Sequence, residues 1–283
     1  MPSVPFHPAA LSSALHVVRR SGLVVVMSCS LMATPALADD LAKIQAENGC
    51  VDCDLERISL RGLAMENADF TDAKLIEADL KQTTLPGAVF TKARMQRVEL
   101  EQAQLVGAVF QSARMRDADL EKSDLSGADL RDADLRDADL ANAKIDGADF
   151  READMRAAYL RRVTGEGASF VEAKLDQADF ERASLPGADF TDARLKGIDL
   201  DRATVIRGIF RDADLSNARL SSTDLSGADF RGADFQDALL RRTNFSGANL
   251  SDTNGLDQEQ LDIACGDDKT ILPRSLTIPA CGG

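Results

Sequence analysis

The chain is poor in the side chains on which most enzyme chemistry depends. It has no Trp, a single Tyr (Tyr159) and two His, and both histidines, His7 and His16, lie within residues 1–38. Those residues read as an export signal, so the chain after them offers no His as a general base or metal ligand. One Tyr and no Trp also argue against an aromatic platform for nucleobases. We expect no catalytic residue, no cofactor and no metal site.

A hydrophobic run long enough to cross a membrane is missing too. An Arg pair, Arg19-Arg20, precedes a short apolar run, and Ala36-Leu37-Ala38 precedes Asp39. This is the pattern of a cleaved export signal over residues 1–38, which predicts a periplasmic or secreted protein with no transmembrane span afterwards. The leader contains two Arg and no acid. Its removal therefore makes the net charge of the mature chain more negative than the formal −14 of the whole chain.

Other interpretations of the leader stay open. The segment Val26-Met27-Ser28-Cys29 resembles a lipobox, which would leave a lipoprotein anchored at Cys29. The Arg pair hints at twin-arginine export, although the residues around it match that signal poorly. A disordered leader on a cytosolic protein is disfavoured because the leader lacks acids. The Ala-x-Ala site favours ordinary cleavage.

What the chain does have is a five-residue pattern over residues 53–252. Every fifth residue from Leu55 to Leu250 is Leu, Phe, Met, Ile or Val, except Gly165, and a small residue, usually Ala, stands two places before most of them. A period of five fits neither a helix nor a strand alone. It fits a short extended segment followed by a corner, repeated.

The Phe residues show how many corners make one turn of the chain. From residue 70 to residue 250, the core centre at every twentieth position is Phe, except at Leu130 and Leu250. This predicts a buried ladder of stacked rings at Phe70, Phe90, Phe110, Phe150, Phe170, Phe190, Phe210 and Phe230. Gly recurs on the same period from Gly87 to Gly247, with Arg207 as the exception. A corner that selects Gly needs positive φ, as in a type II turn. One coil is therefore four pentapeptides.

Runs such as Ala128-Asp129-Leu130 and Ala133-Asp134-Leu135 resemble the pentapeptide-repeat proteins. The resemblance covers residues 53–252 and implies an all-β fold, a right-handed, square-sectioned β-helix of about ten coils. Such a rod would be roughly 45 Å long at about 4.8 Å per coil. Its thin core depends on stacking neighbours and on capped ends.

Both ends carry segments that we expect to act as caps. Residues 39–52 can form a helical turn begun by Asp39 or Asp40, with Leu41 and Ile44 covering the first coil. Residues 253–283 read as a helix over Leu256–Ala264 followed by an extended tail. This resembles the C-terminal caps of bacterial relatives, which often dimerise end to end, so a homodimer through this cap is an expectation.

Each end of the rod carries two cysteines. A zinc site at Cys50 and Cys53 lacks enough ligands, and nothing suggests a redox pair, so a structural disulfide is the default in an exported protein. Because the ends of the rod are too far apart for cross-end bonds, we predict the pairs Cys50–Cys53 and Cys265–Cys281.

The outward positions carry the charge, with the greatest acidic excess on the face of the Phe ladder. We consider it a docking surface for a cationic partner, through Asp69, Asp129, Asp149 or Asp189, although a merely solvated surface explains the excess as well. Gly165 gives the core no side chain, and we expect a void or bend there. It is either a ligand notch or a tolerated defect.

Two functions fit these observations. The first is an exported, non-catalytic binding or structural module, a rigid acidic rod that meets a protein or another envelope component. The second is suggested by relatives that mimic duplex DNA and bind topoisomerases, and the export signal disfavours it. Nucleic acid is not an expected partner. An enzyme is a distant third, since nothing supplies a converging nucleophile, base and oxyanion site.

Overall fold

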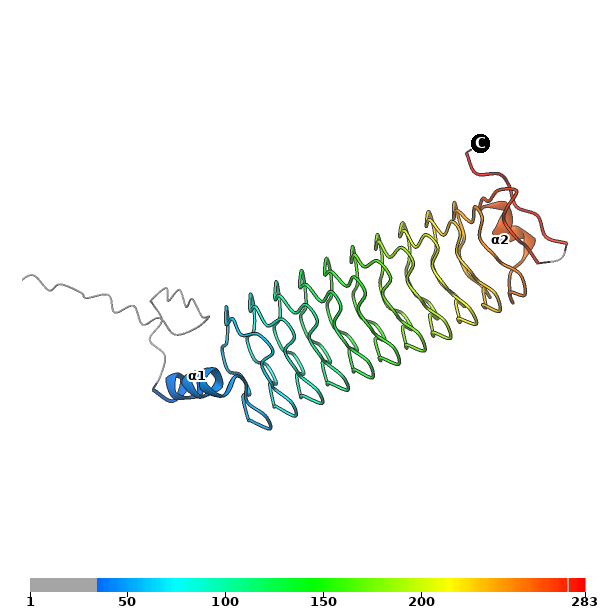
Figure 1. Cartoon of the computed structure of the whole chain (residues 1–283). Coiled ribbons are helices and arrows are strands. Elements are labelled where there is room, and N and C mark those ends of the chain that lie inside the picture. The colour runs from blue at the N-terminus through cyan, green and yellow to red at the C-terminus, as the bar shows by residue number, and fades with distance from the viewer. Residues whose placement is uncertain (1–34, 274, 283) are drawn as a thin grey trace, which may run out of the picture.

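A computed structural model describes residues 35–273 and 275–282 and shows one elongated stack of coils (Figure 1). Its two helices are α1 (Pro35–Glu47) and α2 (Gln258–Asp262), one at each end of the stack. The predicted signal up to residue 34 lies outside the described residues. No helix in the described part of the chain is both long and apolar enough to cross a membrane.

Successive coils are joined by single parallel β-bridges between residues 20 apart, such as Asp69↔Val89 and Val89↔Val109. Four such bridges occur in each coil, separated by two-residue turns, so the described residues form a ladder of bridged positions without longer strands. Each bridge is held by backbone hydrogen bonds: the Phe70 amide donates to Val89 O at 2.7 Å, and the Val89 amide to Ala68 O at 2.8 Å. The predicted 20-residue coil is confirmed.

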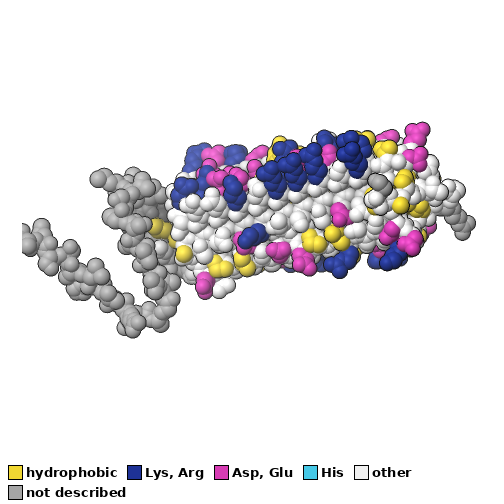
Figure 2. All heavy atoms as spheres, turned by 90° about the horizontal axis from the view of Figure 1, so that it is seen from above, with side chains coloured by type: hydrophobic (Ala, Val, Ile, Leu, Met, Phe, Trp, Pro, Cys, Tyr) yellow, Lys and Arg dark blue, Asp and Glu magenta, His cyan; other side chains and the backbone are white. Residues whose placement is uncertain are grey.

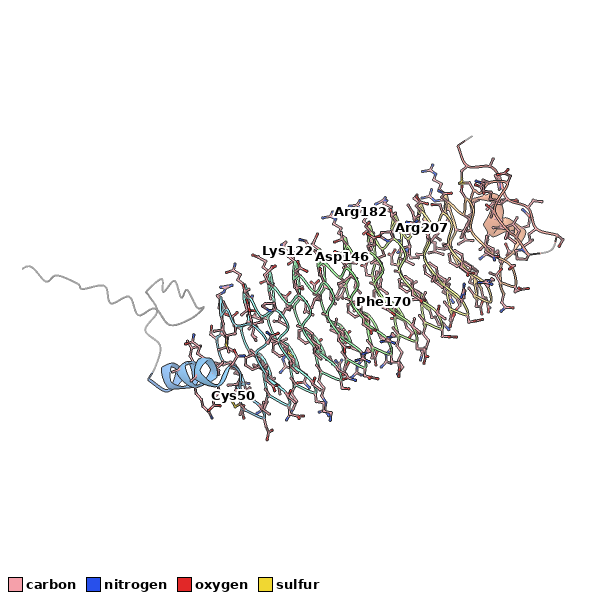
Figure 3. The ribbon with its side chains drawn as sticks, in the orientation of Figure 1. Cys50, Lys122, Asp146, Phe170, Arg182 and Arg207 are labelled. Carbon is pink, nitrogen blue, oxygen red and sulfur yellow. A yellow bond between two sulfur atoms is a disulfide. The ribbon has the colours of Figure 1, made fainter. Side chains whose placement is uncertain are left out.

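The four faces are numbered here in chain order. Core centres recur every 20 residues, on face 1 from Phe70, face 2 from Leu75, face 3 from Leu80 and face 4 from Leu85. Corner 1 follows face 1 along the chain, and corners 2 to 4 follow the other faces. Corners 1 and 3 are therefore diagonally opposite, and in Figure 3 the label of Arg182 marks corner 3 along the upper edge.

The core consists of the repeat centres and the small residues two places before them, nearly all of them fully buried. The Phe side chains of face 1 stack with ring centroids 4.7 to 5.2 Å apart, in one run over Phe70, Phe90 and Phe110 and a second over Phe150, Phe170, Phe190, Phe210 and Phe230. Leu130 separates the runs. Phe180 of face 3 meets Phe170 edge-on at 5.8 Å, so the two faces share one apolar interior.

Positive φ at the glycine corner is confirmed, and the same conformation also occurs at the other three corners. The second turn residue is left-handed at all four corners, for example Asp72 (φ 56°), Glu77 (φ 57°), Gln82 (φ 58°) and Gly87 (φ 64°). This conformation costs a non-Gly residue on the order of 1 kcal/mol. Its amide donates to the next coil, as Asp72 does to Thr91 O at 2.9 Å. Nothing in the structure explains why corner 4 alone prefers Gly.

The coil at Gly165 is regular, so the expected bend is absent. The bridges Lys144↔Thr164 and Thr164↔Ser184 continue through it, and the Gly165 amide donates to Ser184 O at 2.9 Å. A Cβ on Gly165 would collide with the side chain and backbone of Ile145. The core accommodates this glycine because Ile145 occupies the space that a side chain would need.

The N-terminal cap is a longer helix than the sequence suggested. Helix α1 begins at Pro35, so Asp39 and Asp40 lie inside it and do not cap its N-terminus. Ile44 is buried and Leu41 packs against the core beside the first coil. These are the two residues predicted to close this end. The predicted cleavage after Ala38 would remove the first turn of α1.

The C-terminal helix is shorter than predicted. Helix α2 has only five residues and begins with a capping box between Asp257 and Gln260, and Ile263 lies outside it with half of its surface exposed. The Gln260 side-chain amide donates to Phe235 O and Ala238 O at 3.0 and 2.9 Å, pairing carbonyls of a late coil. Leu261 is buried, so the segment covers the end of the core as expected.

Candidate interaction surfaces

The four aspartates predicted to form a contact face are already engaged within their own turns. Each stands one residue before a face 1 centre, and its Oδ1 accepts the backbone amide two residues later: Thr71 to Asp69 at 2.9 Å and Thr191 to Asp189 at 2.9 Å. The Thr hydroxyls donate to the same oxygens at 2.6 Å. This local bond stabilises the turn. It gives Asp at this position a structural role.

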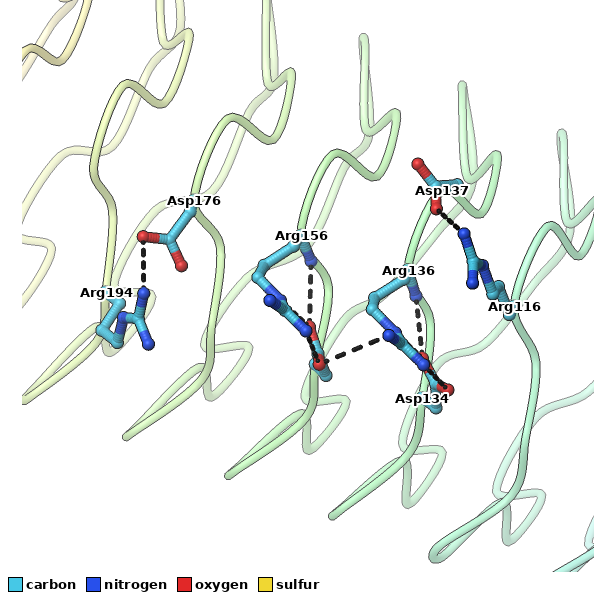
Figure 4. Close-up of polar contacts among 8 residues, drawn as sticks. Arg116, Asp134, Arg136, Asp137, Arg156, Asp176 and Arg194 are labelled. Atoms are coloured by element: carbon cyan, nitrogen blue, oxygen red, sulfur yellow. Dashed lines mark hydrogen bonds and ion pairs between the residues drawn. The ribbon is translucent and has the colours of Figure 1, made fainter.

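Two of these aspartates are also bound by arginine. Arg131 forks onto Asp129 with bonds of 2.8 and 2.6 Å, and Arg151 binds Asp149 in the same way. The Arg131 bond holds the pKa of Asp129 below its usual range. Figure 4 shows the equivalent forks on face 2, Arg136 to Asp134 and Arg156 to Asp154. Asp129 and Asp149 are therefore neutralised by arginine, whereas Asp69 and Asp189 accept hydrogen bonds only from the uncharged Thr groups of their own turns.

An uninterrupted row of exposed acids lies next to face 1, at corner 1. In five successive coils the second turn residue is acidic, and each of these side chains belongs to an exposed residue that makes no ion pair with another described residue: Asp132, Glu152, Glu172, Asp192 and Asp212. We call this row the acidic edge. Its carboxylates are one coil, about 4.8 Å, apart. The sequence shows these acids as residues that recur at intervals of 20. Summing the charge of each whole face does not separate them from the other charged positions.

Face 3 has a second acidic column of a different kind. Asp79, Glu99, Asp119 and Asp139 stack at bridged positions without an arginine fork. Burial, and then the nearby charges of Glu101 and Asp139, raise the pKa of Asp119. Tyr159, whose side chain is half exposed, interrupts the column before Asp179 and Asp199.

Corner 3, diagonally opposite the acidic edge, is rich in arginine over its C-terminal half. The two turn residues of five successive coils include six arginines, Arg161, Arg162, Arg182, Arg202, Arg241 and Arg242, which we call the basic edge. Figure 2 is viewed from the side of this corner and shows dark blue side chains in a line along the stack. The net acidic composition thus hides two edges of opposite sign.

The surface has no deep cleft among the residues described. One depression, about 610 Å³, is lined by charged and polar side chains from corner 1 and face 2 near the N-terminal end, including Asp72, Lys92, Arg94 and Arg114. No group of three or more His, Cys, Asp or Glu in the described ranges is arranged to hold a metal ion. This architecture offers flat faces and straight edges for contact.

Four of the five cysteines lie at the two ends of the stack. The Cα atoms of Cys50 and Cys53 are 5.6 Å apart, and those of Cys265 and Cys281 are 4.8 Å apart, with both pairs of sulfurs placed as disulfides. The second pair joins the tail to the segment after α2, where Gly266 and Ala280 are also bridged. Cys50 is labelled near the N-terminal end in Figure 3.

A 20-residue coil with four turns is typical of one class of repeat solenoid. The family model for pentapeptide repeats matches in eight overlapping copies that cover residues 50–164 and 166–247, leaving out only Gly165 between them. The chain belongs to the pentapeptide repeat family. A comparison with curated protein sequences finds no match.

Similarity to one solved structure supports the shared fold. HetL of Nostoc sp. strain PCC 7120, a pentapeptide repeat protein involved in heterocyst differentiation regulation, aligns with a TM-score of 0.61 at 23% identity, over 82% of this chain and 98% of its own. QnrB1, a plasmid-mediated fluoroquinolone resistance protein, aligns at 0.47 and 18% identity, over 65% of this chain and 89% of its own. At these identities the similarity to HetL concerns the fold alone.

Proposed function

We propose that this chain is an exported, non-catalytic binding module, a right-handed four-sided β-helix that holds a cationic partner in the cell envelope along its acidic edge. The observation that carries the proposal is the row from Asp132 to Asp212, in which five exposed carboxylates make no ion pair with another described residue. Acids on the neighbouring bridged positions are used by their own turns.

The acidic edge suits a protein partner with regularly spaced positive charges. Like charges at adjacent coils repel one another, so the fold gains no stability from keeping five in a row. A cationic partner would relieve that repulsion. Exposed charge pairs contribute more to association rate and specificity than to affinity, so we expect fast, salt-sensitive binding.

Export is supported by the leader pattern and by cysteine pairs at both caps, since disulfides persist in oxidising compartments. Cell fractionation with mass spectrometry of the N-terminus tests it. We expect a protein outside the cytosol that begins at Asp39. Acylated Cys29 at the N-terminus would instead show a lipoprotein.

The partner is tested by placing a photo-crosslinking amino acid at position 172, on the acidic edge, or at position 237, an exposed acid on corner 2. We expect one dominant cross-linked partner from position 172 only, lost in the double variant Glu152→Lys/Asp192→Lys. The matched control is Glu166→Lys/Asp268→Lys, which changes two exposed acids elsewhere. Cytosolic location with residues 1–38 retained, together with inhibition of DNA supercoiling, would reverse the proposal.

A further inference from the structure

The basic edge forms a separate surface that the proposed function does not use. It comprises the turn residues of corner 3 in five successive coils, which are six arginines, two acids (Glu181 and Asp201) and two serines. The same corner in the five coils before it has Arg61, Lys81 and Lys122 against Glu101 and Glu121. Positive charge is therefore concentrated in the C-terminal half of one straight corner.

Part of this charge is neutralised locally, and the rest is free. Arg161 pairs with Asp179, and Glu181 lies between Arg182 and Arg202 at 3.5 and 3.3 Å. Asp201 is bound by Arg219 of the adjoining face.

Three arginines, Arg162, Arg241 and Arg242, make no ion pair within the described ranges, and all three are exposed. They stand at the two ends of the edge. Four coil steps of about 4.8 Å separate Arg162 from Arg242, roughly 19 Å.

Two exposed apolar side chains flank the same arginines. Tyr159 and Leu239 occupy bridged positions of face 3, and each precedes an arginine pair by two residues: Arg161-Arg162 and Arg241-Arg242. They are 50% and 56% exposed, whereas the other side chains of this column are charged, except for Ser59. Arg with an aromatic or aliphatic neighbour is the combination found at the interface between lipid headgroups and acyl chains.

The acidic edge does not oppose a contact made here. Because it lies at the diagonally opposite corner, it faces away from whatever the basic edge touches. At physiological ionic strength charge acts over about 8 Å, so a surface in contact with corner 3 senses the arginines more strongly than the net charge of the molecule.

We propose that the basic edge seats the rod lengthwise on a membrane surface that carries anionic phospholipid headgroups, with Tyr159 and Leu239 at the interface. A straight, convex row of side chains fits a flat surface, and the apolar pair distinguishes a lipid surface from a soluble polyanion. The acidic edge then points away from the membrane, toward a soluble partner.

Co-sedimentation with vesicles of phosphatidylcholine, with and without about a third phosphatidylglycerol, tests this proposal. We expect binding only to the anionic vesicles, lost in high salt. The variant Arg162→Gln/Arg241→Gln/Arg242→Gln should lower the partition coefficient on the order of 100-fold, since each basic residue near the surface contributes about fivefold. All variants share one N-terminus, so any contribution of the leader is the same.

The matched control is Lys92→Gln/Lys196→Gln/Lys269→Gln, which removes the same charge from exposed positions away from corner 3. It should bind nearly as the unmodified chain does. Equal loss in both triple variants, or no binding of the unmodified chain to anionic vesicles, would overturn the proposal. Circular dichroism checks that each variant is folded.

A further variant separates lipid from other polyanions. Tyr159→Ser/Leu239→Ser should weaken binding to anionic vesicles severalfold. If this variant binds vesicles as tightly as the unmodified chain, and duplex DNA displaces both, the basic edge recognises soluble polyanions and the membrane proposal is wrong. The tests of the two edges are independent. The variant Glu152→Lys/Asp192→Lys changes the acidic edge and leaves the basic edge, Tyr159 and Leu239 as they are, so loss of the membrane proposal would not affect the proposed partner binding.

Discussion

Faces 1 and 3 use the same repeat position in opposite ways. On both faces an acid one residue before the core centre accepts the backbone amide two residues later, as Asp129 does from Arg131 at 3.2 Å and Asp119 from Glu121 at 3.0 Å. On face 1 the side chain of Arg131 then forks onto the carboxylate, whose pKa is lowered. On face 3 the following residue is itself acidic, and burial raises the pKa of Asp119.

The difference shows that the five-residue period and the 20-residue period determine different features of the rod. The shorter period specifies the backbone, because an acid that accepts the turn amide serves any face. The longer period decides which charges become neighbours, because residues 20 apart are bridged. Binding surfaces of this rod are therefore encoded in columns of residues 20 apart.

The largest predicted effect concerns the core that the two faces share. Phe170→Ala should lower the free energy of unfolding by about 3–5 kcal/mol, through lost burial and the cavity left behind. Phe170→Asp should not yield a folded rod, because it buries an unpaired charge. Chemical denaturation followed by circular dichroism measures the first.

Because Phe180 meets Phe170 edge-on, Phe170→Ala and Phe180→Ala should couple by at least about 0.5 kcal/mol. If the two single substitutions have additive effects on the free energy of unfolding in the double variant, faces 1 and 3 do not share one interior.

The next effect separates the turn bond from the arginine fork on face 1. Asp129→Ala removes both and should cost about 1–2 kcal/mol. Asp129→Asn keeps an acceptor for the turn amide and loses only the ion pair, which should cost about 0.5 kcal/mol and vanish in 0.5 M salt. Urea denaturation in low and high salt provides the measurement. Equal costs for both substitutions would show that the turn bond contributes nothing.

The same substitution on face 3 should have the opposite sign. Asp119→Asn keeps the acceptor for the Glu121 amide and removes one charge from a column of like charges, which should stabilise the chain by a few tenths of a kcal/mol. The control is Asp129→Asn in the same buffer. A destabilised Asp119→Asn protein would contradict the distinction between the faces.

The smallest effect is the pH dependence of these two variants. The folded-state pKa of Asp129 lies below its unfolded value, so its contribution to stability is present above about pH 4 and is lost as pH falls through the folded pKa. The folded-state pKa of Asp119 is raised, so its carboxylate destabilises the fold at neutral pH, and this penalty disappears as pH falls below the unfolded pKa. Asp119→Asn should match the parent stability near pH 3, whereas Asp129→Asn should approach it from below only as pH falls through the folded-state pKa of Asp129. Denaturation midpoints at pH 7, 5 and 3 provide the test.

Several features of the site could not be derived from sequence for a physical reason. Asp129 and Asp149 looked like free surface acids because the arginine fork depends on side-chain direction at a turn, which the pattern alone does not give. The extent of the terminal helices was also missed, since packing against the end of the coil decides where α1 and α2 begin and end. Neither region has a repeat to constrain it.

By itself the sequence determined the coil length, the buried Phe column and the position of the caps. These follow from period and residue size, because only one winding buries every fifth residue. Only the tertiary structure decided the rest. It showed that every corner is left-handed, that Ile145 fills the space at Gly165, and which charges remain free. Those outcomes depend on contacts between neighbouring coils and on where each long side chain lies, which a linear pattern leaves undetermined.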